Sequence, residues 1–139
     1  MTTPTAPLLL LNLAEQQAQL HRKIDLALGL HGISFTEFSA LKQLHGAAQQ
    51  QMRRIDLAQC IGLTASGVTR MLNPMEKIGL IEKLASDRDA RVSLVKLTIA
   101  GQRLLGEAEV SFTHYAEKML QPFSETERKQ FGRLIEKMR

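Results

Sequence analysis

The stretch from Gly62 to Met75 carries two helical stripes of opposite character, and it constrains the fold more than any other part of the chain. Four apolar residues have the spacing i, i+3, i+4 and i+7, which places them on one face of a helix. They are Val68, Met71, Leu72 and Met75. Four polar residues repeat that spacing two positions earlier, a rotation of about 200°. They are Ser66, Thr69, Arg70 and Asn73. The sequence therefore predicts a short helix with a core face and an opposite hydrogen-bonding face.

The residues around the start of this helix favour a helix-turn-helix. Thr64 can cap the helix by accepting a backbone N–H, and the small residues Ala65, Ser66 and Gly67 allow a close approach to another surface. Residues 55–61, just before this helix in the chain, form another segment with an apolar face. Gly62-Leu63-Thr64 joins the two segments. Two short helices joined by a tight glycine turn are typical of a motif whose second helix reads the major groove of DNA.

A β-hairpin is predicted directly after the second helix. Residues 80–84 and 92–97 are strand-like runs, and the charged, turn-rich segment 86–90 separates them. A hairpin in this position is a wing. The expected fold class is therefore mainly α with a small β wing, a winged helix-turn-helix with dimerisation helices at its N- and C-terminal ends.

The flanking segments have helical periodicity and clear start and stop signals. Residues 8–29 form one predicted helix, which Gly29 and Gly32 end. Ser34 with Glu37, and Ser124 with Glu127, match capping boxes that open two further helices. A long helix follows the wing and stops at Pro122, and Met52 is expected to add a brief strand beside the hairpin.

Composition and charge are those of a soluble globular domain in which the excess positive charge lies in one region. The chain has 139 residues, 44% of them hydrophobic, and its single Cys excludes an internal disulfide and fits a reducing compartment. Residues 52–103 hold nine Lys or Arg against five Asp or Glu, a difference of +4, whereas the remainder holds nine of each. The excess positive charge lies in the predicted winged helix, where a polyanion would dock.

These motifs, in this order and spacing, resemble the MarR family of transcriptional regulators, named for multiple antibiotic resistance. The resemblance covers Phe35 to Gly101 closely and rests on Asp56-Leu57-Ala58, Ser66-Gly67-Val68-Thr69-Arg70 and Asp89-Ala90-Arg91. It implies an obligate homodimer that binds double-stranded DNA. It also implies that the helix beginning near Ala65 enters the major groove, while Arg91, held by a salt bridge to Asp89, enters the adjacent minor groove.

The expected division of the chain and its site follow from this resemblance and the motifs. Residues 1–34 are an N-terminal arm and dimerisation helix, 35–98 the DNA-binding winged helix, and 99–139 C-terminal dimerisation helices. No catalytic residue, metal ligand or cofactor is expected. The candidate DNA-binding residues are Arg53, Thr64, Ala65, Ser66, Gly67, Thr69, Arg70, Asn73, Arg88, Asp89, Arg91 and Lys96.

Two positions depart from the family pattern. Arg53 stands where the family usually has a Ser or Thr that caps the first helix of the helix-turn-helix, so Asp56 is expected to compensate near the positive helix end. Pro74 removes an N–H bond toward Arg70 and should clash with the preceding turn. We expect a kink there, or a break into a reading half, residues 65–73, and a second half, residues 75–78.

The terminal helices have apolar stripes that a second copy could cover across a two-fold axis. The stripe residues are Leu9, Leu13, Leu20, Ile24, Phe112, Tyr115, Phe131, Leu134 and Ile135. The expected function is a cytoplasmic repressor that binds a palindromic operator as a homodimer, with no membrane association. The resemblance also implies a small apolar or aromatic effector that weakens binding, held between residues 20–38 and 104–112.

Alternatives of other classes remain open. An enzyme is disfavoured because the sequence lacks a phosphate-cradling loop, a paired metal-ligand motif and a nucleophile elbow. The four histidines are scattered, which favours separate positions over a metal-responsive site. Cys60 is expected to be a packed apolar residue rather than a redox switch. A winged helix that makes only protein contacts would not need the excess of positive charge in residues 52–103.

Overall fold

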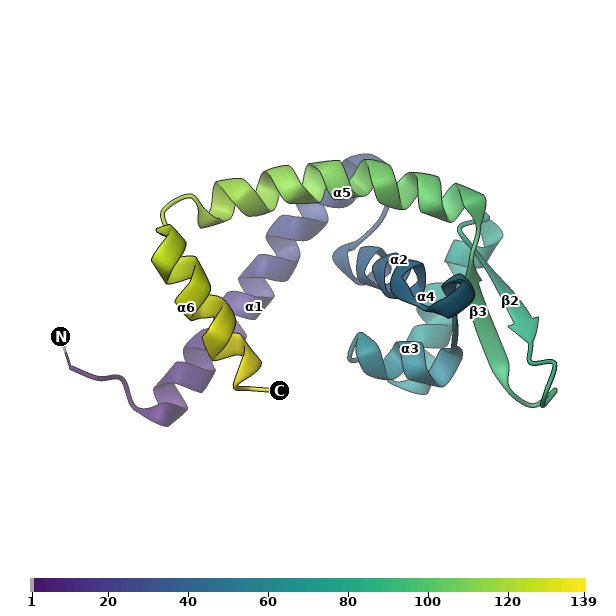
Figure 1. The fold of residues 1–139 in the computed structure, drawn as a ribbon, viewed down its shortest axis with the longest axis horizontal. Helices are drawn as coiled ribbons and strands as arrows, with labels where there is room; N and C mark the ends of the chain where they lie inside the picture. Colours follow the sequence, from purple (N-terminus) through teal and green to yellow (C-terminus); the bar gives the residue numbers. More distant parts are fainter. Residues whose placement is uncertain (1) are drawn as a thin grey trace.

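The computed structural model describes residues 2–139, and it is a helical protein with one small sheet (Figure 1). The helices are α1 (Ala6–Leu28), α2 (Phe35–Gly46), α3 (Arg54–Cys60), α4 (Ala65–Lys77), α5 (Ile99–Leu120) and α6 (Glu125–Glu136). The strands are β1 (Gln51–Arg53), β2 (Ile81–Ala85) and β3 (Ser93–Leu97). Short 3-10 turns cover Gly29–His31 and Ala48–Gln50. The predicted mainly α fold with a winged helix-turn-helix is confirmed.

The sheet is antiparallel, with the strand order β1-β3-β2. Met52 pairs with Val95 of the central strand, which confirms the brief strand expected beside the wing. Ile81 pairs with Leu97 at the base of the hairpin, and both side chains are buried. Because side chains alternate across a strand, Val95 and Leu97 face the core while Lys96 lies on the other face.

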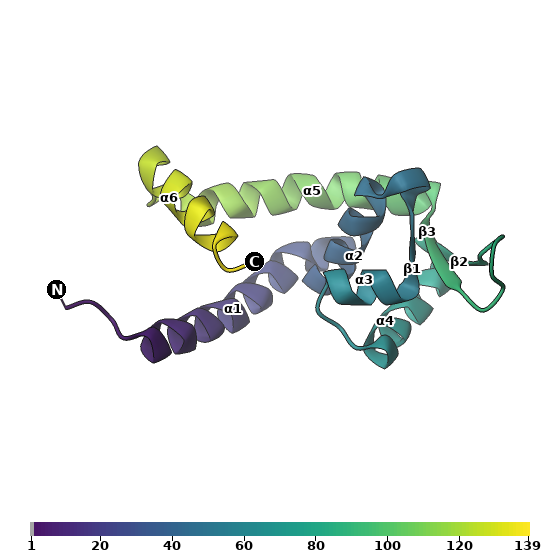
Figure 2. The same cartoon turned by 60° about the horizontal axis from the view of Figure 1, so that its bottom comes forward.

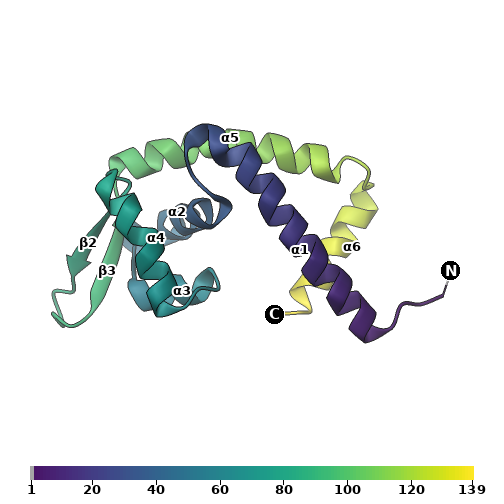
Figure 3. The same ribbon diagram turned by 180° about the vertical axis from the view of Figure 1, so that it is seen from behind.

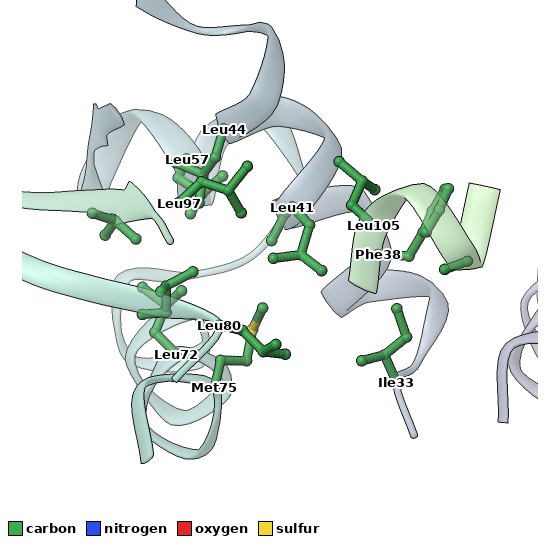
Figure 4. Packing of buried hydrophobic residues seen from close by; sticks show 14 of the residues in the cluster. Ile33, Phe38, Leu41, Leu44, Leu57, Leu72, Met75, Leu80, Leu97 and Leu105 are labelled. Atoms are coloured by element: carbon green, nitrogen blue, oxygen red, sulfur yellow. The ribbon is translucent and has the colours of Figure 1, made fainter. Parts of the chain in front are cut away.

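One hydrophobic core joins the helix-turn-helix to the sheet and to the N-terminal part of α5. Figure 4 shows side chains from α2, α3, α4, the sheet and α5 converging on it. Its fully buried large side chains include Leu41, Leu44, Leu57, Leu72 and Met75. Val68 is buried beside them, so the apolar stripe of α4 faces the core as predicted. This packing fixes the direction in which the polar stripe of α4 points.

The predicted helix starts are confirmed in detail. Ser34 and Ser124 each form a capping box with the glutamate three residues later. Thr64 accepts the backbone N–H of Gly67 at 3.0 Å and so caps α4. After α1, Gly32 ends the 3-10 turn Gly29–His31 in the left-handed conformation, with a φ of 73°, which favours glycine.

Of the kink or break expected at Pro74, the break is wrong, because α4 runs as one helix from Ala65 to Lys77 with Pro74 inside it. Pro74 is exposed, whereas Leu72 and Met75 on either side of it are fully buried. Their packing holds the turn in place despite the missing N–H. The Ile78 N–H also donates to the Pro74 carbonyl at 3.1 Å, so the helix end remains hydrogen-bonded.

The terminal helices extend away from the winged helix (Figures 1 and 2). α5 spans the molecule, and α6 folds back from its far end (Figure 2). Leu9 is 51% exposed and Phe131 is 46% exposed, so both apolar stripes are open in the single chain. Within residues 2–139, no helix is long and apolar enough to cross a membrane.

Part of the stripe assigned to a second copy is covered by the chain itself. Ile24 is only 3% exposed and belongs to the core, and Leu20, Phe112 and Tyr115 pack against that core. The assignment of Ile24 to an intersubunit contact is therefore wrong. Periodicity identifies an apolar face, but it does not say which neighbour covers it.

Candidate nucleic-acid interface

The polar face of α4 is directed outward by its capped start and its buried face. Ser66, Arg70 and Asn73 are exposed, and Thr69 is half-buried. The hydroxyls of Thr64 and Ser66 lie 3.3 Å apart, within hydrogen-bonding distance. The first turn of α4 thus presents free backbone N–H groups and small hydroxyl side chains, which suit close approach to a phosphate backbone or a base edge.

Arg54, at the start of α3, holds the first turns of α4. Its Nη1 donates to Thr69 Oγ1 at 2.6 Å and to the Ala65 carbonyl at 3.1 Å. The Thr69 hydroxyl donates to the same carbonyl at 3.1 Å. These bonds orient Thr69 and join the two helices of the motif on the polar side, opposite the core.

The other end of the polar stripe is attached to the wing through Lys83 of β2. Its ammonium donates to Asn73 Oδ1 and lies 3.9 Å from a Glu76 carboxylate oxygen. The Lys83 backbone N–H donates to the other Glu76 carboxylate oxygen at 3.1 Å. Since lysine has no acceptor, Asn73 must present its oxygen to Lys83, which leaves its amide N–H groups for an outside partner.

Arg53 is the uncapped start of α3, as expected. No side chain caps the helix there, and the Arg53 guanidinium instead pairs with Asp56, with Nε 2.9 Å from Oδ2. The hydrogen bond from Arg53 holds the pKa of the Asp56 carboxyl below its usual range. Asp56 lies in the first turn of α3, so its charge also faces the positive helix end.

The tip of the wing has the arginine and carboxylate pair that the resemblance implies. Arg91 Nε lies 3.2 Å from Asp89 Oδ1, and the Arg91 backbone N–H donates to the same oxygen at 3.0 Å. The Arg91 side chain is 90% exposed. Arg88 is anchored by its backbone N–H, which donates to Ser86 Oγ at 3.2 Å. Arg91 therefore projects from a tip whose conformation is fixed by local hydrogen bonds.

The start of α4 and the tip of the wing lie on the same side of the molecule, opposite α5 (Figure 3). Arg53 and Arg54 belong to the neighbouring start of α3. Lys96 lies elsewhere, because it is next to the end of β3 that leads into α5 and pairs with Glu82 across the sheet. The start of α4 and the tip of the wing, which carry most of the predicted residues, therefore share one side, and Lys96 lies at the base of the wing.

The winged helix also matches known proteins. The family model described as the MarR family matches residues 33–93, from the turn before α2 to the start of β3. The transcriptional repressor MprA of Escherichia coli strain K12 is 27% identical over 122 residues, covering 88% of this chain and 69% of MprA. The winged helix of this chain is therefore similar to that of the MarR family.

Solved structures show the same fold over nearly the whole chain. The transcriptional regulator BldR from Sulfolobus solfataricus has a TM-score of 0.85 and 24% identity, covering 99% of this chain and 98% of BldR. Sco3205, a MarR family regulator from Streptomyces coelicolor solved in complex with DNA, has a TM-score of 0.86 and 18% identity, covering 99% of this chain and 89% of Sco3205. The flanking helices are thus part of the fold that these structures share.

Sequence reasoning missed two functional candidates in this chain, Arg54 and Lys83. Each lies outside α4, and each donates to a polar residue of α4. Both basic residues are visible in the sequence near the helix-turn-helix. Their partners, however, depend on how α3 and β2 pack against α4. No local pattern identifies such a contact.

Aromatic side chains pack together in part of the region expected to hold an effector. Phe112 of α5 packs on Phe38 with ring centroids 4.9 Å apart, and it stacks on Phe35 at 6.0 Å. Beside them, His31 Nε2 and Ser111 Oγ lie 2.7 Å apart. A shallow surface depression of about 470 Å³ is lined by Ala27 of α1 and by Val110, Ser111, His114, Tyr115 and Lys118 of α5, so it overlaps the expected effector region in part.

Cys60 differs from its predicted environment. It is exposed, because the buried face of α3 consists of Leu57 and Ala58, and Cys60 ends the helix on another side. The prediction that Cys60 is packed is therefore wrong. In the part of the chain that the structure describes, no three His, Cys, Asp or Glu side chains group as metal ligands do.

Proposed function

We propose that this chain is a transcriptional regulator that binds double-stranded DNA as a homodimer. The polar face of α4 would enter the major groove, and Arg91 would enter the neighbouring minor groove. The main observation in support is that the start of α4 and the wing tip lie on the same side of the molecule. An arginine side chain suits a narrow, electronegative minor groove, and its pairing with Asp89 restricts its orientation.

The proposed contacts divide into reading and anchoring residues. Ser66, Thr69, Arg70 and Asn73 would face base edges, since they form the polar stripe of α4. Thr64, Ala65 and Gly67 at the start of the helix, Arg53 before α3 and Arg88 in the tip of the wing would contact the phosphate backbone. The excess of four positive charges in residues 52–103 supports such contacts. Lys96 would add to the positive electrostatic potential of the domain without contacting DNA directly.

The homodimer is proposed from the open apolar faces of α1 and α6. Leu9, Leu13, Phe131, Leu134 and Ile135 are each about half exposed in the single chain, and they lie on helices that extend away from the winged helix. We propose that residues 1–34 and 99–139 supply the dimer contacts and residues 35–98 the DNA contacts. A two-fold axis through this layer relates two α4 helices, so the operator would be an inverted repeat.

We further propose that the protein represses transcription in the cytoplasm and that a small apolar or aromatic effector releases it. Repression is supported by the name of MprA, a transcriptional repressor. An effector would act only if it prefers one separation of the two winged helices over another. Val110 and Tyr115, which line the depression on α5, offer it apolar and aromatic contacts.

Selection of bound sequences from random duplex DNA tests the proposed activity. The wild-type protein should enrich an inverted repeat, and Arg91→Ala should bind it more weakly by about 1–3 kcal/mol while remaining folded. The control is Arg103→Ala, which removes an exposed positive charge from α5, outside the proposed DNA contacts. Failure of the wild-type protein to enrich any sequence would contradict the proposal, and unchanged affinity of Arg91→Ala would contradict the role of the wing.

A further inference from the structure

Arg54 and Thr69 form a closed hydrogen-bonded triangle with the carbonyl of Ala65. Arg54 Nη1 donates to Thr69 Oγ1 at 2.6 Å and to the Ala65 oxygen at 3.1 Å. The Thr69 hydroxyl donates to the same oxygen at 3.1 Å. Both protons of Nη1 and the one hydroxyl proton are therefore used inside the protein.

This triangle determines what Thr69 can offer to an outside group. A threonine hydroxyl has one donor and two acceptor lone pairs. Its proton is directed to Ala65, and one lone pair accepts from Arg54, which can only donate. One lone pair remains. Held in this way, Thr69 is an acceptor and not a donor toward anything that approaches the polar face of α4.

We propose that Arg54 is a positioning residue that determines base specificity through Thr69. An acceptor on α4 selects an amino group in the major groove, which adenine N6 and cytosine N4 supply, over the keto oxygens of guanine and thymine. The inference rests on the proposed function, because it assigns the chemistry of one contact within the proposed DNA site. It predicts adenine or cytosine at the base that Thr69 faces.

Arg54 and the neighbouring Arg53 differ in their hydrogen-bond partners and therefore in their proposed roles. Arg53 is exposed, and its guanidinium pairs with Asp56 on the same helix. Arg54 is half-buried, and its bonds join α3 to α4. Loss of Arg53 removes a charge near DNA, whereas loss of Arg54 also frees the Thr69 hydroxyl to rotate and donate. The two arginines thus provide a matched pair with the same charge and different roles.

The test measures competition binding to the selected duplex and to duplexes that replace the amino-bearing base with a keto-bearing base. The wild-type protein should discriminate between them by roughly 5- to 150-fold at the position that Thr69 faces. Thr69→Val, which keeps the shape and removes the hydroxyl, should abolish this discrimination. Arg54→Met should reduce it several-fold at the same position, and Arg54→Lys, which keeps a cationic donor, should retain it.

The double variant Arg54→Met with Thr69→Val separates an indirect role from a direct one. If Arg54 acts through Thr69, the double variant should discriminate no differently from Thr69→Val alone. Arg53→Met is the charge-matched control and should weaken binding to all duplexes alike. Circular dichroism checks that each variant is folded, and Arg54→Lys tests the proposal even where Arg54→Met does not fold.

Three outcomes would overturn the proposal. Uniform weakening by Arg54→Met, with discrimination intact, would mean that Arg54 only contacts phosphate. An effect of Arg54→Met that persists in the Thr69→Val background would mean that Arg54 reads the base itself. Lost discrimination in Arg54→Lys would mean that donation to Thr69 is not what sets the preference. If the wild-type protein selects no sequence, the proposed function fails first, and this inference fails with it.

Discussion

Gly101, in the first turn of α5, lies directly against the backbone of Leu80 at the base of the wing. A Cβ atom on Gly101 would lie 2.1 Å from the Leu80 carbonyl oxygen. The same oxygen accepts the backbone N–H of Thr98 at 3.2 Å, and Thr98 Oγ1 donates to the Gly79 carbonyl at 2.6 Å. The long helix of the proposed dimer layer is therefore joined to the wing through backbone contacts that leave no room for a side chain.

Gly101→Ala should destabilise the protein by about 1–3 kcal/mol, because the new methyl group meets rigid backbone rather than a flexible side chain. Gly106→Ala on the same helix is the matched control, since nothing lies within 4 Å of a Cβ there. That variant should gain roughly 0.5–1 kcal/mol from better helix propensity. Urea unfolding of both variants checks the pair, and equal effects would show that the Gly101 contact is loose.

Removal of Asp89 should weaken DNA binding although it removes a negative charge near the DNA. Asp89 restrains the Arg91 guanidinium, and Asp89→Ala loses that restraint. Asp87→Ala removes the same charge from the same loop without touching the pair, so it should bind DNA somewhat more tightly. Fluorescence anisotropy on the selected operator gives both affinities. If Asp89→Ala also binds more tightly, repulsion outweighs the restraint, and the pairing has no role in binding.

The wing-tip pair should persist down to low pH. Hydrogen bonds from the Arg91 side chain and backbone hold the pKa of the Asp89 carboxyl below its usual range. A lowered pKa means that the pairing is complete above the ordinary carboxyl pKa, about 3.9, and is lost only as the pH falls through the lowered value. NMR titration of the Asp89 carboxyl carbon measures it. Arg91→Ala should raise the midpoint, and an unchanged midpoint would contradict the pairing in solution.

Charge on the open face of α6 should dissociate the proposed dimer. Phe131 and Leu134 are three residues apart and each about half exposed. Replacing both with Lys removes two apolar side chains from the interface, at a cost of about 3 kcal/mol or more per subunit. Sedimentation at low micromolar concentration should show a dimer for the wild type and a monomer for the variant. Ile78→Lys, at an exposed apolar residue of the winged helix outside the proposed dimer contacts, should remain dimeric.

Much of the fold could be predicted because its signals are local. The capping boxes at Ser34 and Ser124 need only residues three positions apart, and the opposed stripes of α4 lie within a single helix. The paired residues Asp89 and Arg91 are two positions apart in one turn. Each of these features depends on residues that are close together in the sequence, so it could be predicted without knowing the tertiary structure.

The features that sequence reasoning missed depend on packing between elements. Pro74 is tolerated because Leu72 and Met75 are buried beside it, which outweighs the local cost of a proline. Ile24 faces the chain's own core, although its stripe continues into residues that remain open. Arg54 acquires its partner, Thr69, only when α3 packs on α4. Periodicity and spacing carry no information about such pairings.

Hydroxyl-radical footprinting on the selected operator tests the central claim most directly, namely that two α4 helices related by a two-fold axis read successive major grooves. The account predicts two protected regions related by a dyad, on one face of the duplex and about 34 Å apart. Arg91→Ala should lose the flanking minor-groove protection while the dyad remains. A single protected region without a dyad, or protection that is the same on unrelated sequences, would contradict the account.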